Sequence, residues 1–174
     1  MQVPLMSDSS SSVELKDVVM GLHWAPPLEG RAPDSEPANL DAVCLLLDCR
    51  QRLLEVVHPG HLKNANGSVV HTGDSRTGAS TWDDERVFVF LHALAEAVHS
   101  VVFAVVSSNA RPFSDIDGAT CHVSDCTMDD ELLKVPLTVL GPLTEYCVAT
   151  LQRTPGGWVL RPAGPPGFSV SAVL

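Results

Sequence analysis

An oxygen-rich stretch covers residues 69–85, which read V-V-H-T-G-D-S-R-T-G-A-S-T-W-D-D-E. It breaks at Gly73 and ends on three consecutive carboxylates, Asp83, Asp84 and Glu85, after which the chain becomes the strand pattern V-F-V-F-L. Adjacent carboxylates repel one another unless a cation or solvent screens them. Calcium takes about six to eight oxygens from carboxylates, carbonyls and hydroxyl-bearing turns. The stretch therefore predicts either a cation-binding loop or a solvated acidic loop.

Two further oxygen donors, Asn39 and Asp41, stand at the start of an apolar run that continues to Leu47. A continuous run of this kind fits a strand that is buried on both faces. Residues two apart on an extended chain share one face. We therefore expect the two side chains to be able to reach the same ion.

A second acidic window covers residues 115–131, with six acids and neither lysine nor arginine. Its opening, D-x-D-G from Asp115, resembles the start of an EF-hand loop. The twelfth position of such a loop carries an acid, but that position here is Cys126. An EF-hand is therefore excluded.

The composition indicates a globular chain of 174 residues, with 45% hydrophobic and 18% charged residues. This length fits one domain with a sizeable core. The formal net charge of −10 argues against nucleic acid, which needs a basic surface to neutralise phosphate. It also argues against attraction to anionic lipid, and it is compatible with a bound cation.

The five cysteines include two C-x4-C pairs, a spacing that differs from the C-x2-C of zinc knuckles. Cys44 and Cys147 lie in apolar patterns, so we expect buried thiols rather than a zinc site. Met1 to Leu15 lacks the basic and apolar regions of a signal peptide. No apolar run reaches the roughly 18 residues of a membrane helix. A cytoplasmic location is the expectation.

Short apolar runs separated by glycine and proline turns predict about nine or ten strands. One short helix is expected over Leu91–Val98, where apolar residues recur with helical spacing. This pattern is typical of an all-β fold, a two-sheet β-sandwich with one or two short helices. We expect a single domain over residues 13–164, with flexible tails at residues 1–12 and 165–174.

Several motifs, in this order along the chain, resemble the TerD family of tellurium-resistance and stress-response proteins. M-G-L-H-W at 20–24 resembles its G-L-x-W, and N-L-D-A at 39–42 resembles its D-L-D-A. G-S-V-V-H-T-G-D-S-R-T-G at 67–78, closed by D-D-E at 83–85, is similar to its central motif. F-S-D-I-D-G-A at 113–119 and the final hairpin are weaker matches.

The resemblance implies a β-sandwich that holds calcium among its loops and has no established enzymatic activity. The positions that match the family's calcium ligands are Asn39, Asp41, Asp74, Ser75, Thr77, Asp83, Asp84 and Glu85. His71 belongs to the same motif, and we expect it to orient the loop by hydrogen bonding.

The chain departs from the family pattern at three places within these motifs. Asn39 replaces an aspartate, Ser75 replaces an asparagine, and Ala79–Trp82 replaces a run rich in glycine and acids. Each lost charge is expected to weaken calcium binding.

Two other functions stay open beside the calcium-binding module. The chain is either that module, acting with protein partners in a stress-response assembly, or an interaction scaffold with a degenerate metal site. A hydrolytic β-sandwich is least favoured, because neither G-x-S-x-G, G-x-G-x-x-G nor a Walker sequence occurs.

Overall fold

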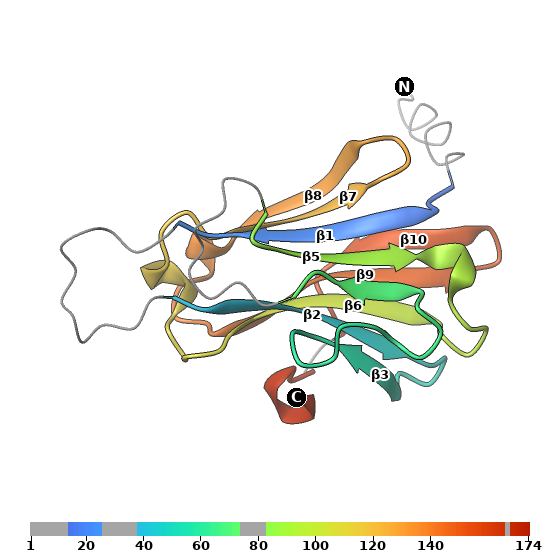
Figure 1. Ribbon diagram of the computed structural model, residues 1–174, viewed down its shortest axis with the longest axis horizontal. Coiled ribbons are helices and arrows are strands. Elements are labelled where there is room, and N and C mark those ends of the chain that lie inside the picture. The colour runs from blue at the N-terminus through green and yellow to red at the C-terminus, as the bar shows by residue number, and fades with distance from the viewer. Residues whose placement is uncertain (1–13, 26–37, 74–82, 166–167) are drawn as a thin grey trace, which may run out of the picture.

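The computed structural model describes residues 14–25, 38–73, 83–165 and 168–174. Ten strands form two five-stranded antiparallel sheets that face each other (Figure 1). Sheet A has the order β4-β5-β1-β7-β8, and sheet B has the order β10-β9-β6-β2-β3. The predicted all-β sandwich is therefore confirmed. The strands are β1 (Asp17–His23), β2 (Leu40–Leu47), β3 (Leu53–Val57), β4 (Val69–His71), β5 (Glu85–Phe90), β6 (Ser100–Ser107), β7 (Thr120–Asp125), β8 (Asp130–Pro136), β9 (Glu145–Thr154) and β10 (Gly157–Pro162).

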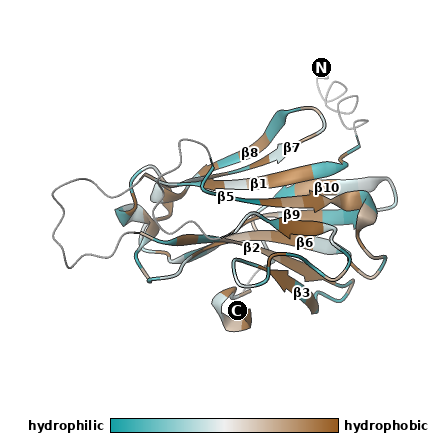
Figure 2. Ribbon diagram, in the orientation of Figure 1, coloured by the Kyte–Doolittle hydropathy of each residue, from teal (hydrophilic) through white to brown (hydrophobic). Residues whose placement is uncertain are grey.

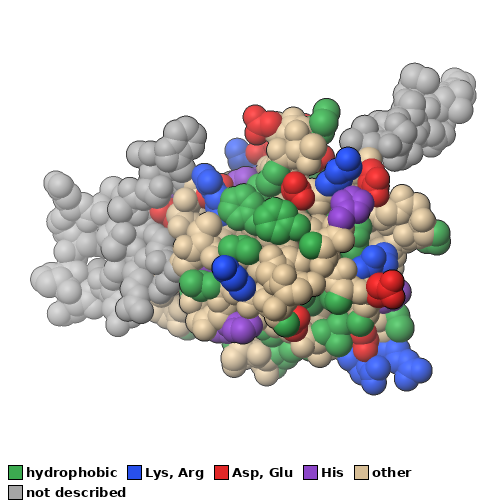
Figure 3. All heavy atoms as spheres, turned by 45° about the vertical axis from the view of Figure 1, so that its right-hand side comes forward, with side chains coloured by type: hydrophobic (Ala, Val, Ile, Leu, Met, Phe, Trp, Pro, Cys, Tyr) green, Lys and Arg blue, Asp and Glu red, His purple; other side chains and the backbone are tan. Residues whose placement is uncertain are grey.

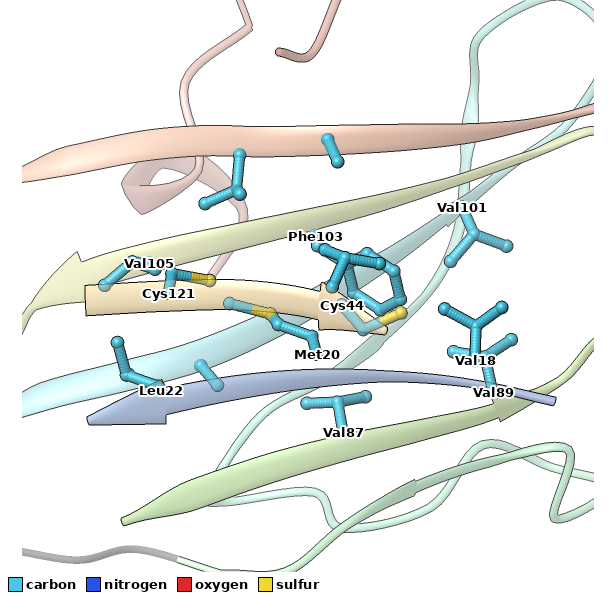
Figure 4. Packing of buried hydrophobic residues seen from close by; sticks show 14 of the residues in the cluster. Val18, Met20, Leu22, Cys44, Val87, Val89, Val101, Phe103, Val105 and Cys121 are labelled. Atoms are coloured by element: carbon cyan, nitrogen blue, oxygen red, sulfur yellow. The ribbon is translucent and has the colours of Figure 1, made fainter. Parts of the chain in front are cut away.

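Alternation of residue types positions the strands of sheet A. In β5, Glu85, Val87 and Val89 are buried, and Arg86 and Phe88 between them are partly exposed. The inward residues of β1, β5 and β7 meet those of β2 and β6 between the sheets, as Figure 4 shows around Phe103 and Met20. Fully burying one such side chain contributes about 1.5–3 kcal/mol, so this layer provides most of the stability.

The central strands of sheet B are apolar on both faces, as the continuous runs in the sequence predict. In Figure 2, long stretches of β2 and most of β3 are brown, the colour of hydrophobic residues. The outward side chains form a second buried cluster, which the C-terminal residues cover. The cluster consists of Val43, Leu45, Leu47, Val102, Ala104 and Val170.

The C-terminal segment, residues 168–174, lies against the outer face of sheet B. Val170 is fully buried there. Its backbone N–H donates to Glu145 Oε2 at 2.6 Å, and the Ser171 hydroxyl donates to Glu145 Oε1 at 2.6 Å. The sequence assigns this segment to a flexible tail, whereas these contacts join it to the sandwich.

The helix expected over Leu91–Val98 is a single 3-10 turn, η1, at Leu91–Ala93. Leu94 leaves the helical region with ψ 140°. Leu91, Leu94 and Val98 are all buried, because a compact turn can direct residues at this spacing inward as a helix does. The other 3-10 turns are η2 (Phe113–Asp115), η3 (Leu137–Leu140) and η4 (Ser171–Val173). Within the described ranges, no helix has the length and apolarity to cross a membrane.

Candidate functional site

One end of the sandwich brings together most of the described candidate ligands. The register pairs Leu22 near the end of β1 with Glu85 at the start of β5. It also pairs Leu40 at the start of β2 with Ser107 at the end of β6. We call this region the loop end and define it as residues 23–25, 38–42, 71–73 and 83–85. Figure 1 shows β1 ending where β2 and β5 begin.

Glu85 connects the two sheets at the loop end. Its side chain is fully buried, and Oε1 accepts a hydrogen bond of 2.9 Å from the backbone N–H of Ala42 on β2. His71 Nε2 lies 3.3 Å from the same oxygen. A buried carboxylate requires such donors, because losing them would leave a charge unpaired in a region without water.

His71, the last residue of β4, contacts Gly73 and Ala42 of β2, and these contacts define its tautomer. Its Nδ1 accepts a 2.8 Å hydrogen bond from the backbone N–H of Gly73. The ring proton is therefore assigned to Nε2, which lies 3.0 Å from the carbonyl oxygen of Ala42. His71 thus fixes the backbone at the end of β4. Its predicted role in orienting the loop concerns residues 74–82, which lie outside the described residues.

Asp84 forms hydrogen bonds with the backbone at the end of β1. Its Oδ2 accepts a 3.0 Å hydrogen bond from the backbone N–H of Trp24, and its own N–H donates to the Leu22 carbonyl at 2.7 Å. The His23 Nδ1 atom lies 3.0 Å from the same Oδ2, at ion-pair distance but without hydrogen-bond geometry. The carboxylate fixes the backbone where the chain leaves the sheet.

Asp83 points in a third direction, to the outer face of sheet A. Its Oδ2 lies 2.8 Å from His122 Nε2 and 3.1 Å from Arg86 Nε. Burial alone would raise the pKa of Asp83. The hydrogen bonds and charges of His122 and Arg86 outweigh that effect, so the pKa lies below its usual value. This carboxylate therefore remains ionised.

Asn39 and Asp41 flank the first residue of β2. The Asn39 side-chain oxygen Oδ1 is buried and has no hydrogen-bond partner among the described residues. The Asp41 carboxylate accepts a hydrogen bond from the Ser108 hydroxyl. An amide oxygen without a donor is costly inside a protein. It is also one of the ligand types that calcium uses, so this oxygen fits a bound cation.

The eight candidate ligands separate into three groups. Asn39, Asp41, Asp84 and Glu85 lie at the loop end, and Asp83 belongs to the same end but directs its carboxylate to His122 and Arg86. Asp74, Ser75 and Thr77 lie outside the described residues. Within the described ranges, no three histidine, cysteine, aspartate or glutamate side chains are arranged to hold a metal. A cation site would therefore need backbone, amide or hydroxyl oxygens, or oxygens of residues 74–82.

Sequence reasoning missed three residues at or beside the loop end, namely His122, Gly21 and Trp24. His122 and Gly21 share a register position with Arg86 across sheet A, and sequence spacing alone does not reveal which strands are neighbours. Trp24 has a buried indole N–H without a hydrogen-bond partner in the described part of the chain. Its place in the M-G-L-H-W motif was the only signal for it.

Comparisons with known proteins give a consistent result. The TerD domain matches residues 2–169 of the chain. Tellurium resistance protein TerZ of Serratia marcescens is 33% identical over 158 residues, which cover 88% of this chain and 81% of TerZ. General stress protein 16U of Bacillus subtilis is 27% identical, with coverage of 86% and 80%.

Solved structures show the same fold. The crystal structure of a homologue of the telluride resistance protein TerD from Streptomyces coelicolor A3(2) superposes with a TM-score of 0.74 at 24% identity. It covers 86% of this chain and 88% of the other chain. Identity at this level is evidence for the fold alone.

Proposed function

Because this chain belongs to the TerD family, we propose that it is a non-enzymatic calcium-binding module of the tellurium-resistance and stress-response type. One observation carries the proposal: the buried Asn39 Oδ1 atom lacks a hydrogen-bond donor among the described residues. A buried polar atom without a partner costs about 1–3 kcal/mol. A bound cation would offset that cost.

The described residues have two roles in this proposal. Asn39 and Asp41 would supply ligand oxygens, together with Asp74, Ser75 and Thr77 from the central motif. Asp84 and Glu85 each use one identified oxygen to hold a backbone N–H, of Trp24 and of Ala42, so they position the strands that carry the ligands. Calcium would neutralise the ligand carboxylates and join the segments of the loop end that carry them. It would catalyse no reaction.

The net charge of −10 supports protein partners in a stress-response assembly rather than nucleic acid. Similarity to General stress protein 16U supports the stress-response assignment. These partners are part of the proposal.

A calcium titration followed by thermal unfolding tests the proposal. A ligand that binds only the folded state stabilises it by about 2.7 kcal/mol at a hundredfold excess over Kd. Calcium should therefore raise the Tm relative to chelator. Magnesium should raise it less, because magnesium demands tight octahedral geometry.

Two substitutions at the loop end should move the calcium response in opposite directions. Asn39→Asp adds a ligand charge and should increase the shift, whereas Asp41→Asn should decrease it. Asp130→Asn is the matched control, because it removes one negative charge at an exposed position of β8, away from the loop end. Equal responses of all three variants and the wild type would contradict the assignment of Asn39 and Asp41.

The second candidate function is an interaction scaffold with the same fold and no metal. It is favoured by the contacts of Asp83, whose carboxylate already has Arg86 and His122 as partners. An unchanged Tm in millimolar calcium would make the scaffold the better account.

A further inference from the structure

A row of side chains crosses the outer face of sheet A next to the loop end. The register pairs Gly21 of β1 with Arg86 of β5 on one side and with His122 of β7 on the other. His122 is paired in turn with Lys134 of β8. Three side chains able to carry positive charge therefore lie on neighbouring strands at the same level, with a glycine between them.

Gly21 leaves a space in this row that Asp83 and His122 occupy. A Cβ atom at this position would overlap His122 Nε2 and the Asp83 carboxylate. The carboxylate lies over Gly21 and contacts both neighbours of the row, Arg86 and His122. It thereby fixes the Arg86 guanidinium and the His122 imidazole against the outer face of sheet A.

A hollow of about 410 Å³ opens beside the row. Its lining consists of Arg86, His122 and Lys134 from the row, together with His23, Asp83, Thr120 and Glu131. The volume lies in the range of about 300–1,000 Å³ that small-molecule sites occupy. The hollow therefore suits a small ligand.

Two cationic groups in the hollow have donors that are not used within the described part of the chain. Arg86 uses only Nε in its side-chain contacts with described residues, and none of those residues accepts a hydrogen bond from its terminal nitrogens. Lys134 has neither an ion pair nor a side-chain hydrogen bond to a described residue. A guanidinium fork and an ammonium at one site form a typical recognition pattern for phosphate.

We propose that this hollow binds the phosphate group of a small soluble molecule. Arg86 and Lys134 supply the charge-assisted hydrogen bonds. Thr120 lines the hollow, and its hydroxyl donates to the Gly118 carbonyl oxygen at 3.2 Å. Asp83 also lines the hollow and is the positioning residue, because its carboxylate holds the guanidinium through Arg86 Nε.

The surroundings limit the ligand to a single phosphate group. Glu131 lies at the same hollow, and the chain carries a net charge of −10. On the face in Figure 3, acidic and basic side chains are interspersed around a hydrophobic group, so this face has no continuous basic track. A polyanion or an anionic membrane would meet repulsion outside the hollow.

Calorimetric titration of the full chain with inorganic phosphate, and then with glycerol 3-phosphate, tests this proposal. Chelator is present throughout, and ionic strength is held constant with chloride, so the result does not depend on calcium binding. We expect saturable binding of both probes. Vesicles of phosphatidylcholine with phosphatidic acid serve as the lipid arm, and they should not bind.

Three charge variants make the test specific. Lys134→Gln should weaken phosphate binding about tenfold, the loss that one charge-assisted hydrogen bond brings. Lys63→Gln removes the same charge at an exposed position outside the hollow and should leave the affinity unchanged. Glu131→Gln should tighten binding by removing a repulsive charge. A matching Tm and far-UV spectrum confirm that each variant is folded.

The proposal is overturned if the wild type binds neither probe at millimolar concentration. It is also overturned if Lys134→Gln and Lys63→Gln have the same effect, or if only the vesicles bind.

Discussion

The middle of the sandwich and its loop end are built from opposite kinds of residue. In the middle, apolar side chains such as Met20 and Phe103 pack between the sheets and are fully buried. At the loop end, the buried atoms include the Glu85 carboxylate, the His71 imidazole and the Asn39 oxygen, which has no partner among the described residues. Apolar burial stabilises without any partner, whereas buried polar atoms need one. The middle therefore maintains the fold, and the loop end is where we propose that the cation binds.

Phe103→Ala should give the largest loss of stability, because it removes a large side chain from the fully buried middle. Substitutions of this kind cost about 3–5 kcal/mol. Urea unfolding measures the loss, and the calcium-induced Tm shift should survive in the variant. If the variant lost the calcium response while remaining folded, the separation between the two regions would fail.

Glu85→Ala should come next, with a loss of about 3 kcal/mol, because it breaks a buried charged contact and leaves the Ala42 N–H unpaired. Urea unfolding again measures the effect. Glu96→Ala, at an exposed position, is the control and should be nearly neutral. A neutral Glu85→Ala would show that the polar contacts of the loop end do not join the sheets.

The C-terminal segment extends the apolar region to the outer face of sheet B, and Glu145 holds it. Burial would raise the pKa of Glu145, but hydrogen bonds from Ser171 and Val170 outweigh it and lower the pKa. The contribution to stability is thus present above the unfolded pKa, near 4.5, and is lost as the pH falls through the lower folded pKa.

Glu145→Gln should therefore cost less than about 1 kcal/mol at neutral pH, because the residue is only partly buried and solvent screens its carboxylate. The difference in unfolding free energy between wild type and variant should shrink as the pH falls below the folded pKa. Urea unfolding at several acidic pH values checks this. If the difference in unfolding free energy stayed constant at these pH values, the hydrogen bonds from Val170 and Ser171 to the Glu145 carboxylate would not contribute to stability.

Cysteine labelling tests, without any substitution, whether the middle of the sandwich stays closed in the native state. Cys44 and Cys121 belong to the middle, where burial raises their pKa, and both should react slowly with a thiol reagent in the native state. Cys147 is partly buried and its pKa is raised to about 11, so it should also be slow. Cys49 and Cys126 are exposed and should label first. Rapid native labelling of Cys44 would show that the middle opens readily.

The sequence predicted the middle better than the loop end, for physical reasons. The apolar run of β2 and the alternation in β5 each determine which faces are buried, so the strands could be read directly. The run at Leu91–Val98 fits both a helix and a compact turn, and the pattern alone did not distinguish them. The partners of Asp83, Asp84 and Glu85 depend on which strands are neighbours, so neither the Asp83–His122 contact nor the role of Gly21 could be predicted.

A crystal structure of the protein grown with calcium tests the central claim most directly. We predict an ion at the loop end with Asn39 Oδ1 among its ligands, at the distance of about 2.3–2.6 Å that calcium–oxygen bonds have. The Asp41 carboxylate should be a second ligand, while Glu85 should still accept the hydrogen bond from the Ala42 N–H. A calcium-grown crystal with no ion there, and with Asn39 Oδ1 bonded to a protein donor or to water, would contradict the claim.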